Sequence, residues 1–404
     1  MFNGELKTIV DTKKLNISSL QNAIPFFKDK TVVCNIHDGS PIRKPESRVL
    51  DALGKVKSLN NKIVNGYDTF NSVMVDVHGS SIRLLSCTPF SNGEANFVGV
   101  EERYNYKNGQ IKDKARRDEI AKYDALGKSF NQKTIVFNQL REINKQLKAE
   151  NPNLTIIDIL DRGFDDVELF ELEEELGNEF IVRGKCNRKS NELYLDENGK
   201  EKAVKLMKQH FVKADEKLYD KIKFKGKTYL EAKGVFEWNQ VKIKERVYSV
   251  LRVSFYKRNG KKIFKDDMLL ITSMAIESFK MANVVWELYM QRAKIESVFK
   301  FCKQELNWEA PRMNDWTAMR NLLSLVYFIA GYFYEIEHEL TKDPSSQWLA
   351  KLGNGKGKVT AHFILKGLAK LIAYLEIKNL VDQNLVSEQD IKKSAQIYLS
   401  KMVT

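Results

Sequence analysis

Short apolar runs and helical stripes alternate along the first half of the chain and predict a mixed α/β core. Compact runs rich in β-branched residues and bounded by polar residues are typical of buried strands. Such runs occupy Thr31–Ile36, Leu154–Leu160, Glu179–Arg183 and Leu269–Ser273. Apolar and polar residues also alternate in Tyr67–Val77 and Ile82–Cys87, on either side of His78–Ser81, and this pattern predicts a β-hairpin.

Longer segments space their apolar residues as helices do. These helical segments are expected at Lys133–Glu150, Asp166–Gly177, Asp315–Glu339 and Val359–Ile377. The first stops before Asn151 and Pro152, because proline disfavours helix both at its own position and at the residue before it. A flexible break is expected at Gly353–Lys358, between the last two.

Other segments lack a clear period. Residues 1–30 are expected to form at most one turn or a short helix, and residues 41–66 a polar connection. Residues 103–129 are dense in charge and predict an exposed, partly mobile connection. Between Gly184 and Asp266 the pattern breaks into short strand-like pieces with a turn at Asn259–Gly260, which indicates a β-rich region.

One predicted helix, Val284–Lys303, carries a charged stripe beside its apolar face. At ~100° per residue, the polar residues on this stripe are Tyr289, Arg292, Glu296 and Lys303. A carboxylate at the border of the apolar face is expected to be half buried and fixed between cations. Taken alone, Arg292 and Glu296 could be only a surface i,i+4 pair worth ~0.3–0.5 kcal/mol.

The spacing of these four residues is that of a known signature. Tyr289-x2-Arg292-x3-Glu296-x6-Lys303 resembles the Y-x2-R-x3-E-x6-K signature of DDE transposases of the insertion-sequence-four family. Four residue types at three fixed gaps make a specific match. The order of predicted strands and helices also resembles the ribonuclease H-like core of that family, which implies a mixed-sheet core interrupted by a β-rich insertion and followed by a helical region.

Two acidic residues that follow predicted strands would complete a carboxylate triad with Glu296. Asp38 follows Thr31–Ile36 at the strand's carboxyl end, and Asp161 follows Leu154–Leu160. Convergent carboxylates from separate elements suit metal-dependent phosphodiester cleavage, and Mg²⁺ accepts such ligands. The order resembles the family's D, D, E, and LDRGFDD at Asp161 resembles its D-R-x-x-D region. Three other acids compete for these roles: Asp158, Asp165 and Asp76. Asp165 is expected to cap the next helix, and Asp76 is expected to be paired in the hairpin.

The resemblance implies an activity, a cofactor and partners. Asp38, Asp161 and Glu296 would be the catalytic and metal-binding residues, with Mg²⁺ as cofactor and Mn²⁺ able to substitute. The phosphate beside the scissile bond would be held by Tyr289, Arg292 and Lys303. The implied reaction is metal-dependent nicking at transposon ends, hairpin-type excision and strand transfer into target DNA. A homodimer would perform it on double-stranded DNA in the bacterial cytoplasm, at the nucleoid.

Two features depart from the family. Its members stack a flipped base on tryptophan, whereas Met268 and Ala293 occupy positions where relatives can carry tryptophan. Trp238 or Trp286 could serve instead, although the wheel position of Trp286 favours packing. Only 37 residues precede Asp38, where relatives usually have a larger DNA-binding domain. This second feature leaves open a catalytically inactive or truncated relative that binds transposon-end DNA as a regulator.

The patterns and the resemblance together divide the chain into five expected parts. They are a short N-terminal segment at 1–30, the first part of the catalytic core at 31–184, the β-rich insertion at 185–267, the last strand and glutamate helix of the core at 268–310, and a helical region for possible dimerisation at 311–404.

Composition agrees with a nucleic-acid partner. The 66 lysines and arginines exceed the 53 acidic residues and give a net charge of +13, which favours a polyanion. Phosphate contacts are expected from the basic segments 103–128, 183–189 and 221–262, so DNA affinity should fall steeply with salt. The four separated cysteines predict reduced thiols, no signal peptide is apparent, and the apolar run Leu322–Tyr334 is too short to span a bilayer.

Overall fold

The computed structural model separates the chain into two compact units, Met1–Ala330 and Gly331–Thr404. It describes residues 10–58, 60–79, 81–195, 200–208, 211, 213–224, 227–342, 347–354, 356, 358–383, 385–387, 389–391 and 393.

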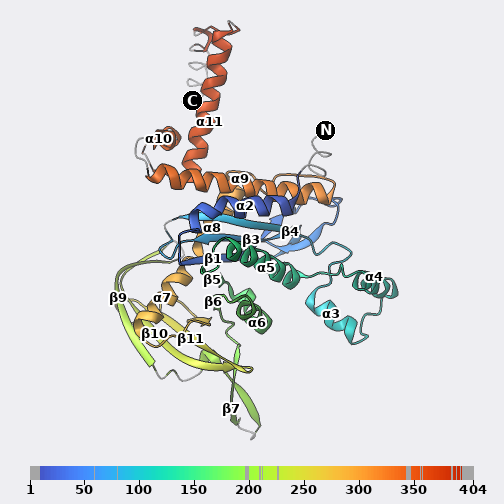
Figure 1. The fold of residues 1–404 in the computed structure, drawn as a ribbon, viewed down its shortest axis with the longest axis vertical. Coiled ribbons are helices and arrows are strands. Elements are labelled where there is room, and N and C mark those ends of the chain that lie inside the picture. The colour runs from blue at the N-terminus through green and yellow to red at the C-terminus, as the bar shows by residue number, and fades with distance from the viewer. Residues whose placement is uncertain are drawn as a thin grey trace. The chain divides into compact units, whose positions relative to one another are not determined.

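A large mixed sheet dominates the first unit (Figure 1). Among the described residues, its strands follow the order β2-β3-β1-β5-β6-β12-β11-β10-β9, with β4 paired to β3. These strands are β1 Val32–Arg43, β2 Gly54–Lys57, β3 Ile63–Val75, β4 Ile82–Phe90, β5 Thr155–Leu160, β6 Glu179–Arg183, β9 Lys213–Phe224, β10 Lys227–Ile243, β11 Arg246–Tyr256 and β12 Met268–Thr272. Strands β1, β5 and β6 pair in parallel and the others antiparallel. The predicted mixed α/β fold is confirmed.

Two apolar clusters pack helices against this sheet. In the first, α2 Thr12–Phe27 and α5 Gln132–Glu150 cover β1, β3, β4 and β5 through residues such as Phe27 and Leu147. In the second, α6 Val167–Leu176 packs Phe170 against β6, β11 and β12. Helix α5 starts where the Asn131 side chain accepts a hydrogen bond from the Thr134 backbone N–H. The strands and helices predicted around residues 133–183 are therefore confirmed.

Three segments are more regular than their sequences predict. Residues 12–27 form the 16-residue helix α2, because its apolar residues Leu20, Ala23 and Phe27 are buried on the sheet. The expected polar connection at 41–66 contains the end of β1, all of β2 and the start of β3. The expected mobile connection at 103–129 instead forms most of α3 Val100–Lys107 and all of α4 Lys114–Ala125.

Ion pairs explain why the charged segment is helical. Arg116 donates to Glu102 and to Glu119, and Arg103 donates to Asp124, so the charges of α3 and α4 bind one another. Figure 1 shows the two helices beside one another at one side of the sheet. Charge density in this segment thus reflects internal pairing as well as exposure.

The β-rich region continues the large sheet. Strands β9, β10 and β11 form a meander, and β11 pairs with β12 from Ser249↔Thr272 to Val253↔Met268. A separate hairpin consists of β7 Lys189–Leu195 and β8 Glu201–Lys205. Strand β12 confirms the strand predicted at Leu269–Ser273. The division into a core and an inserted domain remains a prediction.

The expected helix Val284–Lys303 is two helices, so the prediction of one unbroken helix is wrong. Helix α7 Phe279–Met290 ends before Gln291, and α8 Ala293–Gln304 begins after Arg292. Backbone bonds from Arg292 N to Tyr289 O and from Ile295 N to Arg292 O span three residues, the tighter spacing of a 3₁₀ turn. Both junction residues keep right-handed helical angles, so Tyr289, Arg292 and Glu296 remain near one side.

Helices predicted for the end of the chain are confirmed. The helices expected at Asp315–Glu339 and Val359–Ile377 are α9 Trp316–Lys342 and α11 Ala361–Asp382. Helix α10 Trp348–Asn354 was not predicted, and it includes the first two residues of the expected break at Gly353–Lys358. Helices α10 and α11 cross closely at Gly353 and Gly367, where an added Cβ would lie 2.0 Å from the Phe363 carbonyl and 1.9 Å from the Leu349 carbonyl, respectively. Within the part of the chain that the structure describes, no helix is long and apolar enough to cross a membrane.

Candidate active site

Two parallel strands bring the predicted aspartates side by side. The β1–β5 register runs from Val32↔Thr155 to His37↔Leu160, so the next residues on the two strands are Asp38 and Asp161. Strand β5 ends at Leu160, but β1 continues to Arg43 and pairs Asp38 with Asn71 of β3. The expectation that Asp38 lies at a strand's end is therefore wrong. Pairing with the hairpin extends β1 past this position.

The guanidinium of Arg292 joins the aspartates to the predicted glutamate. Its Nη1 lies 3.3 Å from Asp38 Oδ2 and 2.9 Å from Glu296 Oε1, and its Nη2 lies 3.4 Å from Asp161 Oδ2. The Arg292 side chain is only 16% exposed, whereas that of Glu296 is 62% exposed. Three acids, from β1, from the end of β5 and from α8, thus converge on one cation. The contact between Arg292 and Glu296 is also the i,i+4 ion pair considered as the alternative reading of the sequence.

Burial and repulsion between the carboxylates raise the pKa of one member of this cluster, Asp38. Burial, with smaller contributions from the Asp161 and Glu296 charges, raises the pKa of Asp38 to about 6, although the Arg292 charge and the Gly39 backbone N–H oppose the increase. The Oδ1 atom of Asp161 is buried and has no hydrogen-bond partner among the described residues. Oxygen ligands of this kind suit a hard divalent cation. No three histidine, cysteine, aspartate or glutamate side chains of the described residues lie close enough together to hold a metal ion, since Arg292 lies between these acids.

Tyr289 lies beside the same guanidinium. Burial raises the pKa of its hydroxyl to about 12, with the Asp161 charge adding to the increase and Arg292 and Arg183 opposing it. Gln291, two residues after Tyr289, lies against the turn of the β3–β4 hairpin. A Cβ added to Gly79 of this turn would overlap the Gln291 side chain. Gly79 also has a φ of 65°, a left-handed conformation that favours glycine, so both the backbone angle and the lack of space favour glycine here.

Lys303 is the predicted phosphate-binding residue that lies apart from the others. Its Nζ donates to the Pro41 carbonyl at 2.7 Å and lies 3.6 Å from Glu309 Oε1. Burial lowers the pKa of Lys303, although Glu309 opposes this. The structure therefore gathers four of the other five predicted residues around Arg292 and places Lys303 beside a later part of β1.

The competing acids have structural partners. Asp158 is buried, accepts a hydrogen bond from Asn178 at 2.7 Å and lies 2.8 Å from His37 Nε2. Asp76 closes the hairpin turn by accepting from the His78 backbone N–H. Asp165 was expected to cap the next helix, but Asp166 does so by accepting from the Glu168 backbone N–H.

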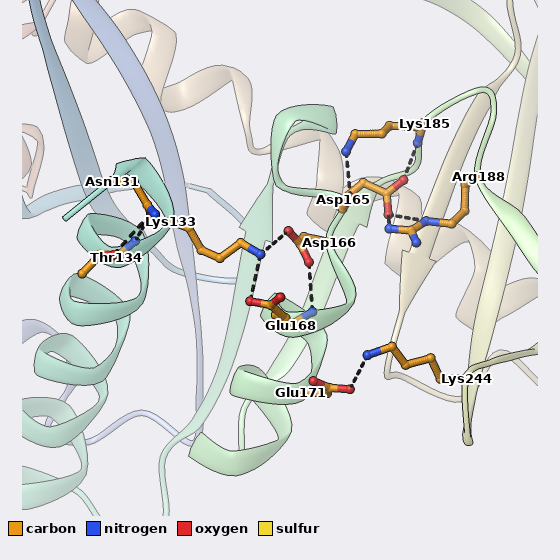
Figure 2. A network of polar contacts seen from close by, with 10 residues as sticks. All are labelled: Asn131, Lys133, Thr134, Asp165, Asp166, Glu168, Glu171, Lys185, Arg188 and Lys244. Carbon is orange, nitrogen blue, oxygen red and sulfur yellow. Dashed lines mark hydrogen bonds and ion pairs between the residues drawn. The ribbon is translucent and has the colours of Figure 1, made fainter. Parts of the chain in front are cut away.

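Asp165 is instead a buried anchor (Figure 2). Its carboxylate accepts from the Lys185 backbone N–H at 2.7 Å and from Arg188, and its carbonyl accepts from Lys185 Nζ at 3.0 Å. It thereby ties the short 3₁₀ helix η1, Arg162–Phe164, to the segment that follows β6. Lys185 is exposed and Arg188 is half buried, and both bind Asp165; the expected phosphate contacts of segment 183–189 remain a prediction.

Further ion pairs in Figure 2 hold α6 from two sides. Lys133 of α5 lies 2.7 Å from Asp166 and 2.9 Å from Glu168, and Lys244, at the β10–β11 turn, lies 3.0 Å from Glu171. Helix α6 follows the turn η1 directly, so these contacts attach the helix next to that turn.

A buried polar chain next to the site was not predicted. His37, one residue before Asp38, has Nδ1 2.7 Å from Ser72 Oγ and Nε2 2.8 Å from Asp158 Oδ1. Gln139 of α5 donates to the same serine oxygen. This chain links β3, β1 and β5 at the position of the carboxylates. A histidine inside an apolar strand, directly before an acid, is the signal that could have identified it.

The candidate stacking residues are all buried. Trp286 packs with its ring centroid 5.3 Å from that of Phe255, and Trp238 and Met268 are 6% and 7% exposed. None of the three presents a ring or side chain for a flipped base in this structure. The base-stacking role therefore stays without a residue.

Comparison with known proteins agrees with this geometry. The sequence model of one family, described as transposase DDE domain, matches residues 133–330. Asp161, Arg292 and Glu296 lie inside this match, and Asp38 lies before it. None of the curated proteins matches the chain. Residues 133–330 are therefore similar to a transposase DDE domain, a class of domain that acts in DNA binding and transposition.

Proposed function

We propose that this protein is a metal-dependent DNA transposase of the insertion-sequence-four type, built on a ribonuclease H-like core. One observation carries the proposal: Asp38, Asp161 and Glu296 come from β1, the end of β5 and α8, and all meet Arg292. The parallel pair β1–β5, flanked by the antiparallel β3 and followed by β6, supports the assignment of the core.

The carboxylates would hold Mg²⁺, and Mn²⁺ could replace it. Their oxygens, including the unpaired Asp161 Oδ1, form a donor set that fits this cation, and Arg292 would have to leave the space between them. When bound, the ions would activate the attacking hydroxyl and stabilise the leaving oxygen. Arg292 and Tyr289 would then orient the phosphate beside the scissile bond, the arginine through its planar fork.

The remaining steps and the assembly belong to the same proposal. The enzyme would nick transposon ends, excise through a hairpin intermediate and join the 3′ hydroxyl to target DNA as a homodimer. Helix α11 supports the dimer with exposed apolar side chains, which a second copy could cover. These side chains are Ile372, Tyr374, Leu375 and Ile377.

A cleavage assay tests the proposal directly. The purified protein is incubated with a duplex that carries the flanking terminal repeat, in Mg²⁺ or in EDTA. We expect cutting at the repeat boundary only with the metal. Specific binding of the repeat without cutting in either buffer would contradict the proposal and would favour a regulatory or decayed relative.

Cleavage should also depend on pH through Asp38. Its pKa of about 6 means that protons compete with the metal for this carboxylate below that pH. At fixed, subsaturating Mg²⁺ we expect the rate to fall about tenfold per pH unit below pH ~6 and to recover partly when Mg²⁺ is raised. Binding of the same DNA in EDTA serves as the control for unfolding. A rate that stays level between pH 7 and 5 would contradict this assignment.

The same shift has a consequence for stability. The pKa of Asp38 in the folded protein lies above its ordinary value of 3.8, so ionised Asp38 destabilises the metal-free folded protein above pH ~6. This destabilisation is lost as the pH falls from about 6 towards 4.

A further inference from the structure

A carboxylate near the candidate active site is held by cationic donors. Glu309, in the segment between α8 and α9, accepts two hydrogen bonds from the Arg43 guanidinium, from Nε at 2.9 Å and from Nη2 at 2.7 Å. The backbone N–H of Arg43 donates to Oε1 at 3.2 Å, and Lys303 Nζ lies 3.6 Å from it. A guanidinium fork, a backbone N–H and an ammonium group are equally the donors that proteins use to bind phosphate.

These donors lie on the strand that carries Asp38. Lys303 donates to the carbonyl of Pro41, and Arg43 ends β1. At ~3.3 Å per residue, Pro41 lies about 10 Å and Arg43 about 16 Å from Asp38 along the strand. A DNA backbone that leaves the carboxylates along β1 would therefore meet these cations next.

The carboxylate of Glu309 can be displaced without loss of its backbone segment. Lys44 is buried and donates from Nζ to the carbonyls of Glu309 and Pro311, so the segment has its own attachment to β1. The side chains of Arg43, Glu309 and Lys303 are 25%, 23% and 19% exposed, and a ligand from solvent can reach them.

The ionised carboxylate of Glu309 binds Arg43 and Lys303 in this structure. Burial opposes ionisation of Glu309, but its hydrogen bond with Arg43 and the charge of Lys303 keep the pKa of the carboxyl below its usual value. The ionised carboxylate thus offers the two cations one negative charge. A phosphodiester offers the same charge with oxygens that accept the same bonds.

We infer that Arg43 and Lys303 form a phosphate-binding site for the DNA strand, and that the Glu309 carboxylate fills this site until a phosphate displaces it. The inference rests on the proposed function for its substrate class, and it adds Arg43 and Glu309 to the residues that act on DNA. A purely structural tie between β1 and the following segment is the competing role for Glu309.

DNA affinity measured in EDTA separates the two roles. Glu309→Gln removes the competing charge and should tighten binding of a terminal-repeat duplex about three- to tenfold, since a charged contact is released to the DNA. Arg43→Gln should weaken binding and reduce the slope of log affinity against log salt by about one. Glu46→Gln is the matched control, because Glu46 lies three residues after Arg43 and loses the same charge.

The double variant and the stability of each protein complete the test. In the Arg43→Gln background, Glu309→Gln should bring a smaller gain, because only Lys303 of the two cations remains to bind the phosphate. A purely structural tie would instead lower the melting temperature of both single variants and leave affinity and salt slope unchanged. The inference is overturned if Glu309→Gln binds no more tightly than Glu46→Gln, or if Arg43→Gln keeps the full salt slope.

Cleavage by the unaltered protein in Mg²⁺ distinguishes this inference from the proposed function. Cutting with no gain from Glu309→Gln would reject only the phosphate site. Tighter binding by Glu309→Gln with no cutting by the unaltered protein would reject only the catalytic proposal.

Discussion

Replacing Glu296 by glutamine is expected to abolish metal-dependent cleavage of transposon-end DNA, lowering its rate by at least about a thousandfold. The amide removes one of the three negative charges that converge on Arg292 and cannot replace a carboxylate as a metal ligand. The fold should survive, because the side chain is 62% exposed and pairs with Arg292, which keeps both aspartates as partners. Single-turnover cleavage in Mg²⁺ measures the loss.

The Glu296→Gln variant should still bind DNA although it no longer cleaves it. With cleavage gone, the affinity for the duplex in EDTA should stay within about threefold of the unaltered protein, because one exposed charge is removed. Glu277→Gln is a suitable control, since Glu277 is an exposed glutamate ahead of α7 and lies outside the carboxylate cluster. Nicking retained by Glu296→Gln at the rate of Glu277→Gln would rule out Glu296 as a metal ligand.

Replacing Asp165 by alanine should cost about 3 kcal/mol of unfolding free energy, since it leaves Arg188 without its buried partner. The Lys185 backbone N–H also loses its acceptor. The turn η1 connects Asp165 to Asp161, so we also expect cleavage to fall by about 10–100-fold, as when a metal ligand loses its support. Denaturant titration and single-turnover cleavage measure the two effects.

A neighbouring aspartate provides the control for Asp165. Asp166→Ala removes the same charge but only a helix cap and an exposed pair with Lys133, which should cost about 1 kcal/mol. The double variant Asp165→Ala, Arg188→Met should recover part of the stability, because no isolated charge remains buried. Equal unfolding free energies for the Asp165→Ala and Asp166→Ala proteins would show that the anchor is unimportant.

Sequence patterns located the elements of the core because their apolar residues repeat locally. The hairpin β3–β4, helix α5 and strands β5, β6 and β12 all lie where the apolar and polar periods predict them. The same reasoning failed for α3 and α4, which lack a buried apolar stripe and are linked by ion pairs such as Arg116 with Glu102. It also missed the break at Gln291, because both junction residues keep helical angles and hardly disturb the period.

What the sequence by itself determined was the kind of residue and its spacing: the three acids, the gaps between Tyr289, Arg292, Glu296 and Lys303, the excess of basic over acidic residues and the order of strands and helices. The tertiary structure decided which of these residues meet. The in-register parallel pairing of β1 with β5 sets Asp38 beside Asp161, 123 residues apart in the sequence. The junction between α7 and α8 brings Arg292 to both aspartates, 254 residues after Asp38, and no local pattern spans such separations. The packing of distant elements also forms the ion pairs of Arg43 with Glu309 and of Asp165 with Arg188. Hydrophobic periodicity reports which face of an element is buried, but the partner of a charged side chain depends on how distant elements pack.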